Sequence, residues 1–434
     1  MTSERGPELK VETFFRHQQG RVVASLTRLL GPKHLALAEE SVQEACLRAL
    51  RSWAMRGVPD DPAAWIFLAA RNHALDVLRK QARHRGAGAG LESEVTRTLS
   101  AVESPPAAQQ DDVLRLIFTC CHPELPRSGR VALTLRVVGG FTTEEIAHSF
   151  LLAETAVAQR LVRVKRRIAT RGLPYRVPTG AELPGRLDAV LDVIYLIFNE
   201  GYAPHGGEAP LRIELMEEAL RLGEMLTRSA ATETPVAHAL LALLWLQSSR
   251  TPARVDAAGG LVPLLSQDRS LWDRARIARG LSHLSRAAAG AVVSEFHLQA
   301  GIAAAHAIAD SPDQTDWGAI VELYDQLLAL NGSPVVRLNR AMAISMRDGA
   351  EVGLALLDQL ERGRTGRVST GPEPTGGGRL ARYHLLAAAR ADNLARLGRT
   401  EEAAAEYARA ADLARNGAER RFLRSRASSL RSVG

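Results

Sequence analysis

Apolar residues recur at helical spacing along most of this 434-residue chain. Residues 36–53 form the first clear example, since charged and polar residues occupy the positions between the apolar ones. A break at residues 57–62 follows, and Asp60 or Asp61 can cap a second helix over residues 63–85. These patterns predict two amphipathic helices within a first segment, residues 1–85. The residues expected near the inward face of the first helix are Leu37, Val42, Ala45, Cys46, Ala49 and Leu50.

The rest of the chain divides where apolar periodicity is lost. Residues 86–110 are rich in Gly, Ala, Pro, Ser and acidic residues, which predicts a flexible, mildly acidic linker. A second helical unit covers residues 111–176, and Pro and Gly residues that follow mark its end. Residues 186–434 have a helical pattern again, apart from a loop predicted at residues 362–379.

The second unit contains the pattern of a helix-turn-helix. Thr142 and Glu145 stand in the capping-box relation, which predicts that a helix begins there. A turn through residues 149–153 leads to a second helix with one apolar stripe at spacings of four, three and four residues. The rest of that helix is rich in Arg and Lys, so it can enter the major groove of DNA, or it can simply be solvated. The stripe consists of Val157, Leu161, Val164 and Ile168.

Composition favours helices throughout. Apolar residues make up 46% of the chain and aromatic residues only 5%, while Ala, Leu and Arg, which favour helices, are abundant. We therefore expect an all-α protein rather than a β-sandwich or barrel. The formal net charge of +7 suits a partner rich in phosphate.

The three cysteines, Cys46, Cys120 and Cys121, do not form a disulfide framework, which indicates a reducing compartment. The polar N-terminus and the lack of an apolar run of about 20 residues predict a cytoplasmic protein without a membrane partner. Adjacent cysteines beside His122 do not supply the spaced ligands of a zinc site, so no metal is expected. The common hydrolase and phosphate-binding motifs do not occur, so we expect no catalytic residues and no cofactor.

Three stretches resemble the extracytoplasmic function (ECF) sigma factors of bacterial RNA polymerase, and along the chain they follow the order of regions 2 and 4 in that family. Residues 139–168, GGFTTEEIAHSFLLAETAVAQRLVRVKRRI, are similar to region 4, which reads the promoter −35 element. Residues 38–53, AEESVQEACLRALRSW, are similar to the region 2 helix that binds the polymerase clamp. Residues 62–84, PAAWIFLAARNHALDVLRKQARH, are similar to the helix that melts and reads the −10 element. A lone helix-turn-helix is a weak signal, but this ordered pair is a specific one.

The resemblance implies that promoter DNA and core RNA polymerase, through its β′ clamp helices and β flap, are the partners. The residues implied at the −35 element are Thr155, Ala156, Gln159, Arg160, Arg163, Lys165, Arg166 and Arg167. The residues implied at the −10 element are Trp65, Arg71, Asn72, Asp76, Arg79, Lys80 and Arg83. The residues implied at the polymerase are Glu39, Glu40, Gln43 and Glu44.

Several of these assignments have alternatives. Trp65 can stack on a base, but packing in the core is the more common role of an aromatic at helical spacing. The acidic residues contact the polymerase or form a solvated helix start, which the helix dipole favours. Residues 55–61 resemble the loop that captures a flipped −10 base. Two positions depart from the family pattern: Ala153 replaces a frequent Ser N-cap, at a cost of ~1 kcal/mol, and Leu151 occupies a turn position often held by Gly.

Residues 193–208, VIYLIFNEGYAPHGGE, and residues 266–274, SQDRSLWDR, resemble the ECF subgroup that carries a long C-terminal helical extension. Residues 396–416, RLGRTEEAAAEYARAADLARN, are similar to a tetratricopeptide repeat (TPR), but no strict period is visible. We therefore expect an irregular, TPR-like α-solenoid that acts as a regulatory module and binds a regulatory protein or ligand. The residues that keep the repeat's small and aromatic spacing are Ala387, Ala391, Leu394, Gly398, Ala403, Tyr407 and Ala410.

Two polar groups in the extension form either a ligand site or, the interpretation we favour, a buried hydrogen-bond network between helices. They are Asn199, Glu200, Tyr202 and His205, and Asp268, Arg269, Trp272 and Asp273. Two other functions compete with the sigma factor. A one-component regulator with a solenoid sensor would treat residues 10–85 as an unrelated domain. An enzyme would need Asn199, Glu200, His205 and Asp268 to converge on one pocket.

Overall fold

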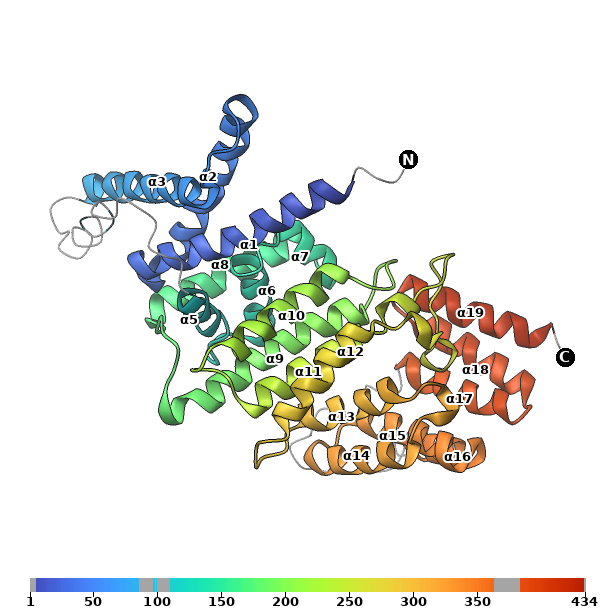
Figure 1. The fold of residues 1–434 in the computed structure, drawn as a ribbon. Coiled ribbons are helices and arrows are strands. Elements are labelled where there is room, and N and C mark those ends of the chain that lie inside the picture. Colours follow the sequence, from blue (N-terminus) through green and yellow to red (C-terminus); the bar gives the residue numbers. More distant parts are fainter. Residues whose placement is uncertain (1–4, 86–96, 98, 100–109, 363–382, 433–434) are drawn as a thin grey trace. The chain divides into compact units, whose positions relative to one another are not determined.

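The computed structural model describes residues 5–85, 97, 99, 110–362 and 383–432, and it is helical (Figure 1). These residues contain 18 α-helices, short 3-10 turns and two isolated β-bridges, and no β-strand occurs among them. The all-α prediction is confirmed. Nearly all of the predicted linker and of the loop at residues 362–379 lie outside the described residues. The chain forms two compact units: unit 1 is Met1–Ile197 with Arg228–Thr232, and unit 2 is Phe198–Thr227 with Glu233–Gly434.

Unit 1 begins with three long helices, α1 (Arg5–Leu30), α2 (Leu35–Arg56) and α3 (Pro62–Arg85). Asp61 caps α3, because its Oδ1 accepts a hydrogen bond of 2.9 Å from the backbone N–H of Ala64. Most of the predicted inward face of α2 is buried, but Leu50 is 71% exposed, so its placement in the core was wrong. Leu50 directly follows the buried Ala49, and successive residues of a helix point about 100° apart.

The second half of unit 1 contains α5 (Gln110–Cys120), α6 (Arg127–Val137), α7 (Thr143–Phe150) and α8 (Glu154–Arg171). The predicted capping box at the start of α7 is present, with Thr142 and Glu145 each bonding the other's backbone N–H. The predicted stripe Val157, Leu161, Val164 and Ile168 is buried. Leu151 ends α7 with φ of 50°, and it is the one described non-glycine residue at positive φ.

The two halves of unit 1 pack against each other. Gly20 of α1 lies so close to the segment after α6 that a Cβ there would stand 2.3 Å from the carbonyl oxygen of Val138. The Tyr175 hydroxyl donates to the carbonyl of Ala24 at 2.7 Å, so the segment after α8 is also bonded to α1. These contacts join α1 to the segments before α7 and after α8 within the compact unit 1.

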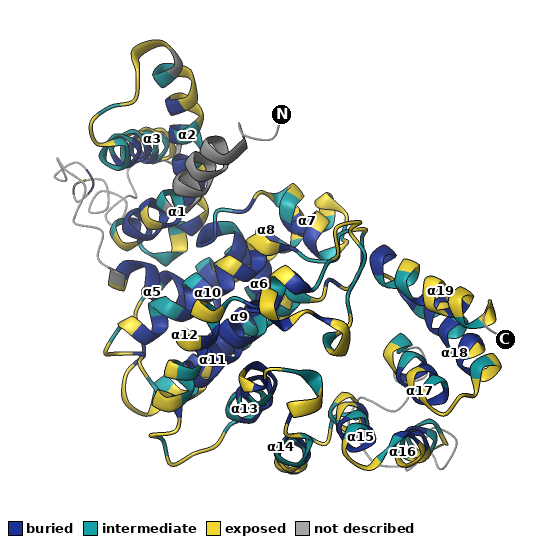
Figure 2. Ribbon diagram, turned by 45° about the vertical axis from the view of Figure 1, so that its right-hand side comes forward, coloured by how far each residue is buried: buried dark blue, intermediate teal, exposed yellow. Residues whose placement is uncertain are grey.

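Unit 2 begins within α9 (Leu183–Tyr202), and from α11 onward each helix packs mainly on its neighbours in the chain (Figure 1). The helix α11 is buried on nearly all sides (Figure 2). The helices are α10 (Ile213–Arg228), α11 (Pro235–Ser248), α12 (Arg274–Ala287), α13 (Glu295–Ile308), α14 (Trp317–Leu330), α15 (Pro334–Asp348), α16 (Ala350–Arg362), α17 (His384–Arg396), α18 (Thr400–Leu413) and α19 (Gly417–Arg431).

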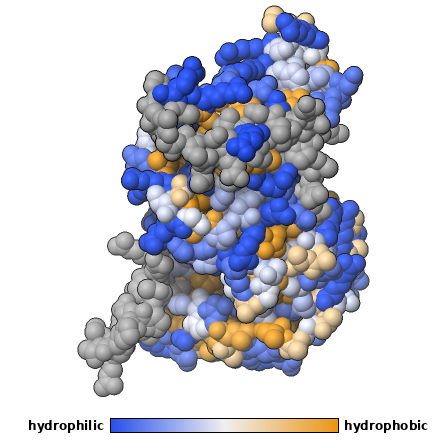
Figure 3. All heavy atoms as spheres, turned by 90° about the vertical axis from the view of Figure 1, so that its left-hand side faces the viewer, coloured by the Kyte–Doolittle hydropathy of each residue, from blue (hydrophilic) through white to orange (hydrophobic). Residues whose placement is uncertain are grey.

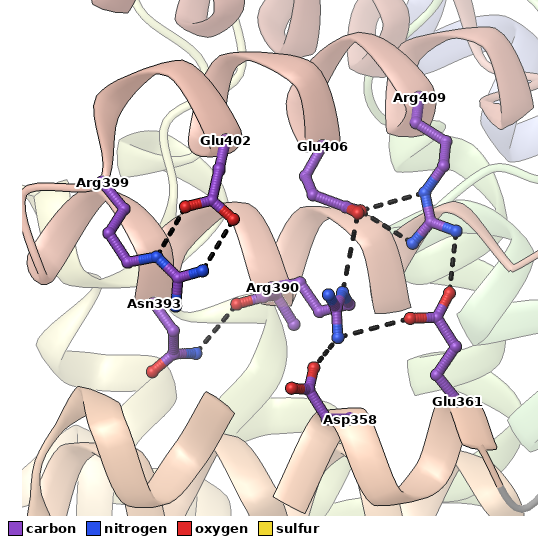
Figure 4. Close-up of polar contacts among 9 residues, drawn as sticks. Asp358, Glu361, Arg390, Asn393, Arg399, Glu402, Glu406 and Arg409 are labelled. Atoms are coloured by element: carbon purple, nitrogen blue, oxygen red, sulfur yellow. Dashed lines mark hydrogen bonds and ion pairs between the residues drawn. The ribbon is translucent and has the colours of Figure 1, made fainter. Parts of the chain in front are cut away.

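Ion pairs join the last helices of unit 2 (Figure 4). Arg390 of α17 pairs with Asp358 and Glu361 of α16 and with Glu406 of α18. Arg409 of α18 extends the network, since it pairs with Glu361 at 2.8 Å and Glu406 at 2.7 Å. The apolar positions predicted from the repeat pattern are buried beside this network: Ala387, Ala391, Leu394, Ala403, Tyr407 and Ala410. The TPR likeness itself stays a prediction.

The surface is polar on the face drawn in Figure 3, where hydrophobic residues gather only in smaller patches. Within the described ranges, none of the helices combines the length and apolar character needed to cross a bilayer.

Candidate nucleic-acid interface

The outward face of α8 carries most of the predicted −35 residues. Because the four-residue apolar stripe is buried, the opposite side of the helix points away from the core. Thr155, Gln159 and Arg163 are exposed there, as are Arg166 and Arg167. Ala156 and Arg160 are half-buried at its margin. This face presents guanidinium and amide groups together, and such groups bond both phosphates and guanine edges.

Lys165 lies apart from this group. Its ammonium is paired with Glu39 of α2, and its side chain is only 17% exposed. Glu39 also accepts a hydrogen bond of 2.6 Å from Arg136 of α6. Lys165 was predicted to contact DNA, and Glu39 was predicted to contact polymerase. In this structure the two residues form an ion pair with each other instead.

The predicted −10 residues lie on α3. Asn72, Asp76 and Arg79 are exposed on one side of the helix, and Lys80 and Arg83 are exposed beside them. Arg71 is half-buried, and its guanidinium donates two hydrogen bonds, of 3.2 and 2.7 Å, to Oδ1 of Asn72. The other side of α3 is buried through Ile66, Phe67, Ala70, Ala74, Leu75 and Leu78.

The aromatic and apolar residues around the start of α3 divide between packing and exposure. Trp65 is half-buried and packs edge-on against Trp53 of α2, with 5.4 Å between ring centroids. This is the packing role that we favoured for it. Met55 in the last turn of α2 and Val58 in the break after it are 81% and 65% exposed. Their apolar side chains are thus available at the loop that resembles the base-capturing loop.

The predicted polymerase residues on α2 differ in exposure. Glu40 is exposed, Gln43 and Glu44 are half-buried, and Glu39 is buried. Leu47 is 49% exposed and, with Leu50, continues the exposed side of α2 beyond Glu40 and Glu44. Sequence reasoning missed both leucines as surface residues. The signal was available, because Leu47 does not fit the buried stripe and Leu50 fits it poorly.

Two of the three cysteines are core residues, and Cys46 is half-buried. Cys120 and Cys121 are buried at the end of α5, and the Cys121 thiol lies 3.4 Å from the Thr134 hydroxyl. Burial raises the pKa of Cys121 to about 12 and that of Cys46 to about 11, so these thiols are poor nucleophiles at neutral pH. The part of the chain that the structure describes contains no group of three or more His, Cys, Asp or Glu side chains suited to a metal.

The residues of the enzymatic interpretation make local contacts. Glu200 is buried and bonds His205 at 2.7 Å. Asp268 is exposed and caps a 3-10 turn through the N–H of Ser270, while Asp273 caps α12 through the N–H of Arg276. No hydrogen bond or ion pair among the described side chains joins Asp268 to Asn199, Glu200 or His205.

Comparison with known families matches three segments of the chain. Residues 14–84 match sigma-70 region 2, and residues 115–168 match sigma-70 region 4. Residues 186–288 match a family of unknown function, DUF6596. An uncharacterized protein of Rhizobium meliloti (strain 1021) is 40% identical over 398 residues, which cover 90% of this chain and 89% of that protein.

These matches decide between the competing functions. The one-component regulator required residues 10–85 to be unrelated to sigma factors, but region 2 spans this segment. Regions 2 and 4 together bind core RNA polymerase and promoter DNA and direct transcription initiation, a role without catalysis. The chain therefore belongs to the sigma-70 family and is an ECF-like sigma factor with an additional C-terminal domain.

Proposed function

We propose that the outward face of α8 reads the −35 element of the promoters that this sigma factor serves. The observation that carries the proposal is the division of α8 into a buried four-residue stripe and an exposed side with Gln159, Arg163, Arg166 and Arg167. An arginine fork bonds both guanine acceptors of the major groove, and the remaining basic residues hold phosphates. On the same reasoning, Asn72, Asp76 and Arg79 on the exposed side of α3 read the −10 element.

The exposed side of α2 is the proposed contact with the β′ clamp helices, and region 4 is the proposed contact with the β flap. Leu47 and Leu50 offer apolar area on α2, while Glu40 and Glu44 add negative charge beside it. An interface with an apolar centre and a charged rim binds through the apolar part, and the charges guide the approach.

The C-terminal extension is proposed to regulate these activities. Its helices from α11 onward pack on their chain neighbours, and such stacks form extended binding surfaces. A regulatory protein or a small ligand is the proposed occupant, and the extension would act in place of a separate anti-sigma partner.

Transcription with purified core polymerase on fragmented genomic DNA tests the sigma function. We expect discrete transcript 5′ ends that depend on this protein and share upstream motifs at two positions. Arg163→Ala should reduce these transcripts at least fivefold, because a lost base contact costs about 1–3 kcal/mol. Arg171→Ala is the matched control at the last turn of α8, outside the predicted face, and should reduce them less than twofold.

Two results would contradict the proposal. Failure of the folded protein to bind core polymerase or to produce protein-dependent transcripts would refute the sigma function. Equal transcript levels from Arg163→Ala and the unmodified protein would refute the role assigned to α8.

A further inference from the structure

A cluster of three arginines and two aromatic rings lies within unit 2. Tyr202 comes from the end of α9, Arg250 and Arg254 from the turn after α11, and Arg269 and Trp272 from the turn before α12. The Arg254 guanidinium lies 3.9 Å from the centre of the Tyr202 ring, and Arg250 lies 5.7 Å from the same ring. Arg250 and Arg269 lie 6.0 and 5.0 Å from the Trp272 ring. Each of the three guanidinium groups therefore lies over the face of at least one of the two rings.

The cluster is buried and carries positive charge without a bound counter-ion from the protein. Arg250, Arg269 and Trp272 are 7%, 5% and 2% exposed. Arg269 donates to the backbone carbonyls of His306 and Ala309, at 3.0 and 2.6 Å, both of which are uncharged. Asp310 attracts Arg269 from a distance, but no ion pair joins any of the three arginines to a carboxylate in the described ranges.

Several donors of the cluster have no acceptor. The Nε–H groups of Arg250, Arg254 and Arg269 are buried without a hydrogen-bond partner among the described residues. The indole Nε1 of Trp272 and the Nδ1 of the neighbouring His306 are in the same condition. Buried polar groups in folded proteins are nearly always paired, so several unpaired donors in one place need an explanation.

Three other arginines of unit 2 have different environments. Arg390 is surrounded by three carboxylates, and Arg221 is paired with Glu218 at 2.6 Å. Arg279 stacks on Trp245 at 5.0 Å, as the cluster arginines stack on their rings, but it is exposed to water. These three arginines are exposed to water or paired with a carboxylate, whereas Arg250 and Arg269 are neither exposed nor paired with a carboxylate among the described residues. Ring faces compensate only part of the lost hydration of a cation.

We propose that Tyr202, Arg250, Arg254, Arg269 and Trp272 form a binding site for a small oxyanion, a molecule bearing phosphate or carboxylate groups. Guanidinium groups match both kinds of oxyanion through paired N–H donors, and the indole N–H of Trp272 adds another donor. Arg254 is only half-buried, so it forms the side of the cluster that solvent reaches. The site goes beyond the promoter function and does not depend on it.

Titration calorimetry on the full-length protein tests the site, with inorganic phosphate in one arm and citrate in the other, at constant ionic strength. We expect saturable binding of one anion per chain, and the tighter arm identifies the phosphate or carboxylate class. Arg250→Met and Arg254→Met should each weaken binding at least tenfold. Arg279→Met, the matched arginine stacked on a tryptophan, should change it less than twofold.

Two controls keep the outcome clear. Arg163→Ala on α8 should leave anion binding unchanged, which distinguishes this site from phosphate bound at the predicted DNA face. Circular dichroism verifies folding, and if Arg250→Met does not fold, the half-buried Arg254→Met decides. The proposal is wrong if the folded protein binds neither anion saturably, or if Arg254→Met binds as tightly as the unmodified protein.

Discussion

At the scale of single residues, local chemistry determines where the helices of the DNA-binding region begin. Thr142 starts α7 with a complete capping box, whereas Ala153 starts α8 with no side chain able to accept a hydrogen bond. The two sites are a natural comparison, because both helices belong to one helix-turn-helix.

Substitution at these two caps should have opposite effects. Ala153→Ser supplies an acceptor for the free N–H groups of α8 and should raise the free energy of unfolding of unit 1 by about 1 kcal/mol. Thr142→Ala removes one half of a formed capping box and should lower it by about the same amount. Urea denaturation followed by circular dichroism measures both. A loss of stability in Ala153→Ser would show that the first turn of α8 is held in another way.

The buried His306 should make unit 2 sensitive to acid. Burial, together with the nearby Arg250 and Arg269, lowers the pKa of His306 to about 3. The unfolded chain, with a histidine pKa of about 6.5, therefore binds a proton between about pH 6.5 and pH 3 that the folded chain does not bind. The free energy of unfolding should therefore decrease as the pH is lowered through this window. The contribution of His306 to this decrease is about 2 kcal/mol between pH 7 and pH 5.

The variant His306→Gln should lose that part of the dependence. His283, whose pKa burial and His238 lower to about 4, acts in the same direction and remains in the variant. We would measure the urea midpoint of unfolding at pH 7 and pH 5 for the unmodified protein and for His306→Gln. His148→Gln, at an exposed position, is the control. If the urea midpoint of His306→Gln changes between pH 7 and pH 5 as much as that of the unmodified protein, His306 is not the source of the pH dependence.

At the scale of elements, α2 and α8 constrain each other through Glu39. This buried carboxylate is bonded to Arg136 and paired with Lys165. We expect Glu39→Gln to release Lys165 and to strengthen binding of random-sequence duplex DNA at least threefold in the absence of polymerase, because phosphate contacts dominate such binding.

Glu44→Gln is the matched control for this change. It removes the same charge from the same helix, but Glu44 pairs only with the exposed Arg48 in the described contacts. Fluorescence anisotropy at fixed salt should show little change for this variant. Equal strengthening in both variants would mean that net charge alone is responsible.

The ion pairs between α16, α17 and α18 give a second prediction at this scale. Arg390 is 17% exposed and lies among three carboxylates, so Arg390→Met should leave like charges together and lower the stability of unit 2 by about 2 kcal/mol. Arg399→Met breaks an exposed pair with Glu402, which water and salt screen, and should lower stability much less. Thermal unfolding measures the stability of both variants. If both lose the same stability, the ion-pair network contributes no more than an exposed pair (Figure 4).

At the scale of the whole molecule, α9 joins the sigma regions to the extension. Its buried Arg186 donates to the carbonyl of Phe118 at 2.8 Å, so the start of α9 belongs to the fold of unit 1. A truncation that tests the extension should therefore retain α9 and end after Tyr202.

We expect this truncated protein to differ from the full-length protein at least threefold in promoter-dependent transcript level. The physical reason is that a covalently attached domain acts at a high effective concentration on the regions it regulates. Circular dichroism and core polymerase binding control for loss of folding. Identical transcript levels, with folding intact, would refute a regulatory role for the extension.

The sequence alone determined the features that depend on neighbouring residues in the chain. The capping box at Thr142 and the stripe from Val157 to Ile168 follow from helical spacing, which brings residues three and four apart onto one face. The family resemblance added the order of regions 2 and 4, which the comparisons bear out.

Only the tertiary structure decided which partners these faces meet. Periodicity marks a face as apolar or polar, but it does not say that Glu39 is buried against α6 and α8 or that Leu50 is exposed. The oxyanion cluster is a further case, because the end of α9, the turn after α11 and the turn before α12 meet only when the helices pack. Such contacts depend on long-range packing, and no local pattern of the chain encodes them.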